Sequence, residues 1–210
     1  MSATIDYKTE LYRKSIHLLS LSIPIGYFFL SKEIALSLLL PLTIIFLVVD
    51  TSKFIYPRFY NSISKLFSFM LREHEKNIKK KTLNGASWVL ISATLTLLVF
   101  PKIIFISAFS ILIISDISAA LIGRKFGKHK FLFKSLEGSL AFFFSAIIVV
   151  LIAPKVDNLL IEYLIGFAGA FVGMFAENLS YGWADDNLTI PFSVGGLMWL
   201  LYSLVLPNLL

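Results

Sequence analysis

The sequence predicts an all-α membrane protein with about seven transmembrane helices and one further amphipathic helix at the membrane interface. Hydrophobic residues make up 57% of the 210 residues, a larger apolar share than soluble domains have, and the mean hydropathy is +0.82. Apolar runs recur along the chain, and the positive charges between them favour alternate connections. We expect residues 1–210 to form a single integral-membrane domain.

Seven apolar runs account for the predicted transmembrane helices. They cover residues 15–30, 34–49, 86–100, 103–122, 138–153, 159–176 and 188–206. Several have only 15 or 16 residues, fewer than the ~20 that cross a bilayer, so we expect these helices to extend into flanking residues or the bilayer to adapt. Pro24 and Pro41 lie inside the first two runs and are predicted to kink them.

The distribution of lysine and arginine predicts the orientation. Sixteen of the 19 lie before the first run, between the second and third runs, and between the fourth and fifth runs. The alternate connections hold only Lys32, Lys102 and Lys155. Because cytoplasmic loops are rich in lysine and arginine, we expect a multi-pass protein with a cytoplasmic N-terminus, in the inner membrane of a prokaryotic cell.

Residues 54–71 are predicted to form an amphipathic helix on the inner membrane surface. Apolar side chains such as Phe59, Ile63 and Leu66 follow helical spacing there, and polar residues fill the opposite face. The basic residues at positions 79–81 favour anionic head groups. We expect this segment to anchor the protein rather than to take part in chemistry.

The segment from Asp116 to Ser139 combines residue types that bind phosphate and metal. Asp116 lies near the end of an apolar run, where a carboxylate is costly. A basic loop with two glycines follows and ends at the start of the next run, and such loops and helix N-termini bind phosphate. The candidate nucleotide-binding residues are Gly123, Arg124, Gly127, Lys128, Lys134, Ser135, Glu137, Gly138 and Ser139. The alternative, that the cations only mark the cytoplasmic side, gives Asp116 and Glu137 no role.

Further carboxylates are predicted on the same side of the membrane. Glu177 lies toward the inner end of the sixth run, and Asp185 and Asp186 lie in the connection that follows it. With Asp116 they are candidate catalytic residues and candidate ligands of Mg²⁺, which takes one or two carboxylates together with substrate phosphates. The alternative for Asp185 and Asp186 is a solvated turn. Glu162, near the outer end of the sixth run, is expected to be interfacial.

Arg13, Lys14 and His17 share one helix face at the inner interface. We consider them candidates for contact with a lipid or nucleotide phosphate, and the alternative is an ordinary interfacial face. The chain has no cysteine, which excludes disulfide and thiolate sites. The loop from Gly123 to His129 lacks the spacing of a P-loop, and the chain has no HExxH zinc motif.

These residues together resemble a known family. The pattern consists of Arg13-Lys14-x-x-His17, Asn84-Gly85-Ala86, Asp116-x-x-Ala119, Gly123-Arg124-x-Phe126-Gly127, Lys134-Ser135-x-Glu137-Gly138-Ser139 and Asp185-Asp186-Asn187-x-x-x-Pro191. It resembles the CTP-dependent lipid kinases, which include dolichol kinase, phytol kinase and the CTP-dependent diacylglycerol kinase. These are similar in turn to phosphatidate cytidylyltransferases. Asp50 and Lys53 stand where some members carry an acid and an arginine, so a role for this pair stays open.

The resemblance implies phosphoryl transfer from CTP, with Mg²⁺ as cofactor, to the hydroxyl of a membrane lipid alcohol such as a polyprenol, dolichol, phytol or diacylglycerol. The reaction would take place at the cytoplasmic membrane face. A cytidylyltransferase that makes a CDP-lipid is the alternative enzyme, and a transporter or a non-catalytic scaffold is the alternative outside enzymes. We expect no nucleic-acid partner, and the sequence leaves the lipid and the oligomeric state open.

Overall fold

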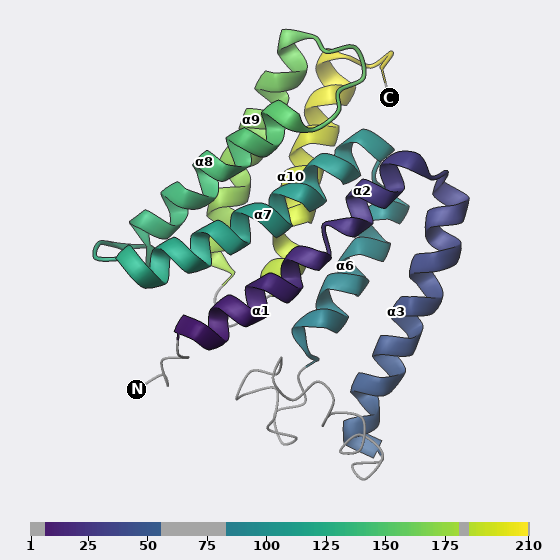
Figure 1. Cartoon of the computed structure of the whole chain (residues 1–210). Helices are drawn as coiled ribbons and strands as arrows, with labels where there is room; N and C mark the ends of the chain where they lie inside the picture. The colour runs from purple at the N-terminus through teal and green to yellow at the C-terminus, as the bar shows by residue number, and fades with distance from the viewer. Residues whose placement is uncertain (1–6, 56–82, 181–184, 210) are drawn as a thin grey trace.

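The computed structural model describes residues 7–55, 83–180 and 185–209, and these residues form a helical bundle with one small hairpin (Figure 1). The helices are α1 (Tyr7–Leu19), α2 (Ser22–Phe29), α3 (Lys32–Ile55), α6 (Gly85–Val99), α7 (Lys102–Phe126), α8 (Leu136–Ile152), α9 (Leu160–Leu179) and α10 (Asp186–Val205). Strands β1 (Lys130–Phe131) and β2 (Lys134–Ser135) pair antiparallel between α7 and α8. The all-α prediction is therefore confirmed.

Each of the seven predicted runs coincides with a helix, but the first run is divided between α1 and α2. The break at Ser20 and Leu21 precedes Pro24, whose ring clashes with the carbonyl four residues earlier in a continuous helix. Helices α3, α7, α9 and α10 are long and apolar enough to cross a membrane, and α6 and α8 are shorter apolar helices. The assignment as an integral membrane protein is thus supported, and the number of seven membrane crossings stays a prediction.

The predicted amphipathic helix cannot be compared with the structure beyond its first residues. Phe54 and Ile55 form the end of α3, and residues 56–82 lie outside the described part of the chain. This gap also contains the basic residues at positions 79–81. The prediction of a surface helix therefore stays a prediction.

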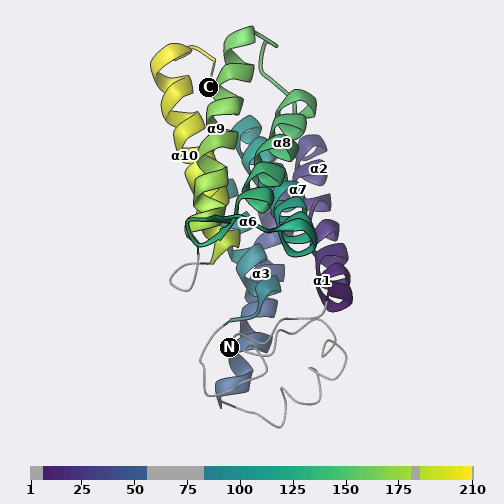
Figure 2. The same ribbon diagram turned by 90° about the vertical axis from the view of Figure 1, so that its left-hand side faces the viewer.

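Helix α7 lies at the centre of the bundle and contributes more buried core residues than any other described helix (Figures 1 and 2). It packs against α1, α2, α8 and α10. Of the most apolar 18-residue stretch of α7, 67% is buried inside the protein, compared with 22% of the corresponding stretch of α3. Phe105, Phe109 and Leu112 are fully buried there. Helix α7 is therefore the element that fixes Asp116, whereas α3 presents most of its apolar surface to the membrane.

Two glycines of α9 allow close packing against its neighbours. A Cβ at Gly166 would lie 2.5 Å from Val150 of α8, and a Cβ at Gly173 would lie 2.8 Å from Val194 of α10. Both distances are shorter than van der Waals contact, so larger residues would separate the helices. The small-residue stripe of α9 thus holds the three C-terminal helices together and places Glu177, one turn beyond Gly173, inside the bundle.

The three lysines outside the basic connections have a structural explanation. Lys102 donates to the carbonyl of Leu30 at the end of α2 over 2.9 Å, and Lys32 donates to Leu98 near the end of α6 over 2.9 Å. Lys155 donates to the carbonyls of Val150 and Ala153 at the end of α8. A cation there satisfies helix carbonyls that lack intrahelical partners. These lysines therefore cap helices on the side away from the basic loop.

Glu162, which was expected at the membrane interface, lies in the first turn of α9 and has partners that the sequence does not show. Glu162 is fully buried and accepts hydrogen bonds from the backbone N–H groups of Val156, Asp157 and Leu159 over 2.7–3.0 Å. It also accepts from the Tyr202 hydroxyl at 3.0 Å. The carboxylate thus satisfies the orphan donors at the start of α9 and links that end to α10, a contact that chain position alone does not reveal.

Candidate active site

The first part of the site is a buried ion pair between α1 and α7. Lys14 Nζ contacts Asp116 Oδ2, and their side chains are only 5% and 7% exposed. His17, one turn after Lys14 on the same helix, has its Nε2 atom 3.7 Å from the same carboxylate oxygen. The predicted face of Arg13, Lys14 and His17 therefore meets the predicted catalytic acid, with Arg13 half-buried beside it.

The second part of the site is an ion pair between the hairpin and α9. Lys134 Nζ lies 2.5 Å from Glu177 Oε1, with the lysine side chain 28% exposed and the carboxylate side chain 4% exposed. Burial disfavours the charged lysine, but the carboxylates of Glu177 and Asp186 outweigh burial and raise the pKa of Lys134. Lys134 is therefore a fixed cation that faces a buried acid.

The two ion pairs belong to one electrostatic cluster. The charge of Lys134 interacts with the carboxylates of Asp186 and Asp116 as well as with that of Glu177. His17 interacts electrostatically with both Asp116 and Asp186. Residues from α1, α7, β2, α9 and the start of α10 thus meet at the end of the bundle that carries the basic loop (Figure 1). Helix packing brings together groups that are far apart in the sequence.

The turn that leads into α8 is compact. Ser135 caps α8, since its Oγ accepts from the Gly138 N–H at 3.2 Å. A Cβ at Gly123 would lie 3.3 Å from the Cα of Gly138, so the end of α7 and the start of α8 approach each other at two glycines. The N-terminus of α8 therefore begins beside Lys134, where the helix dipole favours an anion.

Asn178 is a residue of the site that the sequence analysis missed. Its Nδ2 donates to Ser139 Oγ at 2.8 Å, and its Oδ1 accepts from the Phe133 N–H at 3.0 Å. The fully buried side chain thus ties α9 to both the hairpin and α8. Its position next to Glu177, at the inner end of an apolar run, was the signal that could have identified it.

The adjacent acids Asp185 and Asp186 have different positions. Asp185 is the N-cap of α10, and its Oδ1 accepts from the backbone N–H of Asn187 at 3.0 Å and from the Asn187 side chain at 2.6 Å. The turn that was the alternative interpretation is therefore present at Asp185. Asp186 is the first residue of α10 and contributes to the field at Lys134 and His17, which favours it as the acid that faces the cluster.

The rest of the predicted loop lies at the surface. Glu137 Oε1 is 2.7 Å from Nδ1 of His129, so this acid helps to hold the loop in place. Arg124, Gly127 and Lys128 are exposed. These residues therefore lie at the surface, whereas Lys134 is half-buried and Ser139 is buried, and the roles of all of them in nucleotide binding stay predictions.

The carboxylates can be compared with the needs of Mg²⁺. Among the described residues, the structure contains no group of three or more His, Cys, Asp or Glu side chains placed to hold a metal by themselves. Glu177 Oε2 is buried without a hydrogen-bond partner in the described part of the chain. Because Mg²⁺ usually takes one or two carboxylates and completes its shell with water and substrate phosphates, Glu177 and Asp186 fit such a partial site.

The pair whose role the sequence left open is structural. Lys53 Nζ donates to Asp50 Oδ1 at 2.8 Å, and the backbone N–H of Asn84 donates to Asp50 Oδ2 at 2.7 Å. Asn84 in turn caps α6 by accepting from the Ser87 N–H at 2.9 Å. Asp50 and Lys53 are almost fully buried, so they join the end of α3 to the start of α6.

The fold and the cluster define a helical membrane protein with paired acids and lysines at one end of the bundle. The chain is 30% identical over 165 residues to CTP-dependent diacylglycerol kinase 1 of Schizosaccharomyces pombe, which covers 72% of this chain and 74% of that kinase. It is also 30% identical over 199 residues to an uncharacterized protein of Rickettsia prowazekii, covering 90% of this chain and 93% of that protein. No family model matches the chain, and no solved structure gives a significant match. The chain belongs to the CTP-dependent lipid kinase family.

Proposed function

We propose that the protein transfers the γ-phosphoryl group of CTP to the hydroxyl of a membrane lipid alcohol, at the membrane face that carries the basic loop. Diacylglycerol, a polyprenol or dolichol, and phytol are the acceptors in question. The observation that carries this proposal is the meeting of the Lys14–Asp116 and Lys134–Glu177 pairs beside Asp186. The kinase relative supplies the donor, CTP, and diacylglycerol as one acceptor class.

The cluster is nearly balanced in charge before any substrate binds. Each buried lysine is paired with a buried carboxylate, so a triphosphate entering alone would meet acids already in place. A divalent cation entering alone would meet lysines. Because unpaired buried charges are strongly unfavourable, the nucleotide and Mg²⁺ should bind together, with the phosphates taking the lysines and the metal taking the carboxylates.

In this arrangement Lys134 binds the phosphates of CTP, and the positive end of the α8 dipole favours their charge. Glu177 and Asp186 would hold Mg²⁺, which supplies neutralisation of phosphate charge when bound. Asp116 lies where it can orient the lipid hydroxyl and accept its proton, with Lys14 setting the position of the carboxylate. The lipid oxygen forms a bond to the γ-phosphorus as the bond to the β-phosphate oxygen breaks, which gives a lipid phosphate and CDP.

The cytidylyltransferase alternative uses the same nucleotide but a different phosphorus. A lipid phosphate would attack the α-phosphorus and release pyrophosphate, which brings a second anion to the acceptor end. Lys14 is already paired with Asp116, so a lipid phosphate would have to compete with this carboxylate for the lysine, and a neutral alcohol is the better acceptor.

Labelled CTP distinguishes the two reactions. Purified protein in detergent with Mg²⁺ and a panel of lipid alcohols should move γ-phosphate label into lipid and leave α-phosphate label in soluble CDP. Excess chelator should abolish the transfer. Lipid-bound α-label with release of pyrophosphate would assign the protein to the cytidylyltransferases instead, and no lipid-bound label with any alcohol or lipid phosphate would refute both enzyme assignments.

A further inference from the structure

The hairpin between α7 and α8 has an unusual turn (Figure 1). Strands β1 and β2 are joined by two residues, Leu132 and Phe133. A two-residue hairpin turn with a positive φ at its first position normally carries Gly there. Leu132 adopts such a conformation, with a φ of 50°, in which a side chain crowds the backbone. The turn is therefore strained by a large apolar residue where glycine would fit better.

The turn also exposes its apolar side chains. Leu132 is 47% exposed and Phe133 is 59% exposed. Their position is nevertheless fixed, because the Phe133 N–H donates to Oδ1 of Asn178, a buried residue of α9, at 3.0 Å. The hairpin thus presents two large apolar side chains on a firmly attached support. In contact with water alone, both the strain and the exposure would be unfavourable.

Positive charge surrounds this apolar turn. The acidic residue among positions 124–139 is Glu137, and its Oε1 lies 2.7 Å from Nδ1 of His129. The exposed lysines around the turn are Lys125, Lys128 and Lys130. Lysines beside exposed apolar side chains are typical of segments that bind an anionic membrane surface, since the apolar groups enter the acyl boundary and the cations attract the head groups.

The contact between the hairpin and α9 indicates its depth. Phe131 of β1 packs against Phe175 of α9, with ring centroids 6.2 Å apart. Helix α9 is long and apolar enough to cross a membrane, and its 20 residues cover about 30 Å, the thickness of the hydrocarbon core. Phe175 precedes the end of α9 at Leu179 by four residues, about 6 Å along the axis. The hairpin therefore lies where α9 leaves the hydrocarbon.

Aromatic rings connect the hairpin with the outer surface of the bundle. Phe175 contacts Phe171, with ring centroids 5.1 Å apart, and Phe171 is 51% exposed on α9. Phe171 in turn contacts Phe143 of α8 at 6.1 Å. An exposed phenylalanine within a membrane-crossing helix faces lipid, so the apolar surface of the hairpin continues a surface that is already in contact with the bilayer.

We propose that Leu132 and Phe133 insert into the head-group region of the membrane that holds the protein, and that Lys125 and Lys130 bind the phosphates of anionic lipids there. Interfacial segments bury their apolar face by about 5–10 Å, which agrees with the ~6 Å between Phe175 and the end of α9. Docking fixes Lys134, the residue after Phe133, at the depth of the head groups. The contact with the bilayer does not depend on the proposed reaction.

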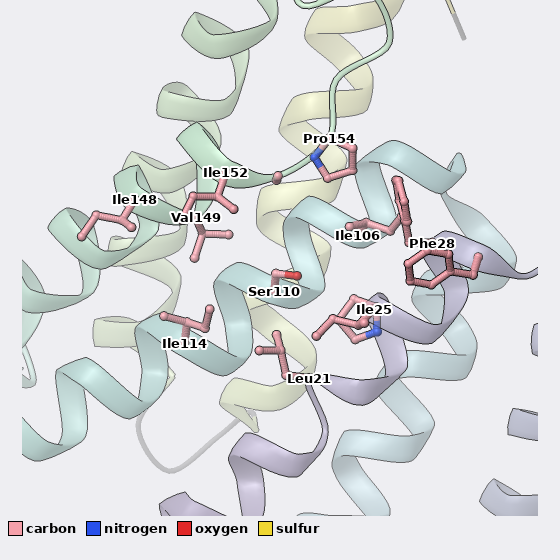
Figure 3. Close-up of a pocket in the computed structure, with 13 residues that line it drawn as sticks. Leu21, Ile25, Phe28, Ile106, Ser110, Ile114, Ile148, Val149, Ile152 and Pro154 are labelled. Carbon is pink, nitrogen blue, oxygen red and sulfur yellow. The ribbon is translucent and has the colours of Figure 1, made fainter.

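A fluorescent label at the turn tests the insertion. The chain has no cysteine, so Phe133→Cys provides a single thiol for an environment-sensitive fluorophore. The matched control is Ile25→Cys. Figure 3 shows Ile25 beside an apolar groove between α2, α7 and α8, and none of the described residues that line the groove is charged. Ile25 is 54% exposed, so it reports contact with lipid where no lysine is involved.

The full chain is reconstituted in phosphatidylcholine bilayers with or without phosphatidylglycerol. Lipids with a nitroxide near the head group should quench the label at position 133 more strongly in the anionic bilayers, because each lysine shifts the docking equilibrium about fivefold. The difference should shrink at high salt, since the Debye length falls from about 10 Å at 0.1 M to about 3 Å at 1 M. Quenching at position 25 should not depend on lipid charge. A label at position 133 that only an aqueous quencher reaches, or equal dependence on lipid charge at both positions, would overturn the proposal.

Variants separate the charged and the apolar parts of the contact. Lys125→Gln with Lys130→Gln should remove the dependence on anionic lipid, and Lys125→Arg with Lys130→Arg should keep it. Leu132→Asn tolerates the positive φ but removes the apolar side chain, so quenching should fall, whereas Leu132→Met should preserve it. Unchanged quenching in Leu132→Asn, or unchanged lipid dependence in the double glutamine variant, would contradict the proposal.

Nucleotide is the competing anion for these lysines. CTP with Mg²⁺ should leave the quenching at position 133 unchanged in anionic bilayers. If CTP instead abolishes the dependence on lipid charge, the lysines bind the nucleotide and the proposal is overturned. These measurements need no turnover, so failure of the proposed phosphoryl transfer and failure of the membrane contact are distinguishable.

Discussion

Replacing Lys134 with methionine tests the ion pair at the centre of the site. The substitution keeps a long unbranched side chain but removes the cation that lies 2.5 Å from Glu177. Glu177 is 4% exposed at its side chain, so the variant leaves a carboxylate buried without its partner. The matched control is Lys130→Met, because Lys130 is an exposed lysine of the same hairpin.

The expected loss of stability follows from the burial of the two partners. Removing one partner of a fully buried pair costs about 3–5 kcal/mol, and the 28% exposure of Lys134 reduces this to about 2–3 kcal/mol because water screens the pair. For a chain of this size the apparent unfolding temperature in detergent should fall by roughly 4–12 °C. Lys130→Met should change stability by less than about 0.5 kcal/mol.

The double variant Lys134→Met with Glu177→Gln separates stability from function. Removing both charges together avoids the unpaired carboxylate, so most of the lost stability should return. Phosphoryl transfer should not return, since a contact to a charged phosphate is worth roughly 1.5–3 kcal/mol, or about 10- to 150-fold in kcat/KM. Wild-type stability in the single variant, or no recovery in the double variant, would refute the ion-pair reasoning.

The pH dependence of the wild type adds a check on the same pair. Because its carboxylate neighbours raise the pKa of Lys134, the stabilisation is fully present below the ordinary pKa of lysine and is lost only as the pH rises through the raised value. In the wild type this contribution of Lys134 should therefore persist through neutral pH and be lost only in strongly alkaline solution. Loss of the contribution in the wild type near neutral pH would contradict this assignment.

Four further predictions concern other parts of the chain. Lys14→Met should destabilise the protein by about 3–5 kcal/mol in the same unfolding assay. Asp116→Asn should abolish phosphoryl transfer while the protein still inserts into the membrane. Near wild-type turnover of this variant would exclude Asp116 from the site. Glu162→Gln should cost about 1.5–3 kcal/mol of stability but leave turnover at low temperature intact, because Glu162 caps α9 away from the site. Lys128→Cys should react with a membrane-impermeant thiol reagent only after the cells are opened. Labelling of this cysteine in intact cells would show that the predicted orientation is wrong.

The sequence predicted the helices because the membrane leaves few alternatives. Backbone groups in lipid must be paired within a helix, so each apolar run was expected to be helical. The break between α1 and α2 in the first run lies just before Pro24. The surface helix at residues 54–71 and the count of seven crossings are not tested by the described residues.

Only the tertiary structure decided which polar residues belong together. Lys14 and Asp116 are 102 residues apart and Lys134 and Glu177 are 43 apart, and no periodicity relates such positions. The same holds for Asn178, which the sequence analysis missed, and for the hydrogen bond from Tyr202 to Glu162, which are 40 residues apart.

Local composition by itself therefore determined where the chain is helical and which end carries charge, because burial in lipid acts on each segment separately. The partners of each buried charge depend on how α1, α7, α8 and α9 pack, since an ion pair forms only where packing brings two side chains within a few ångströms.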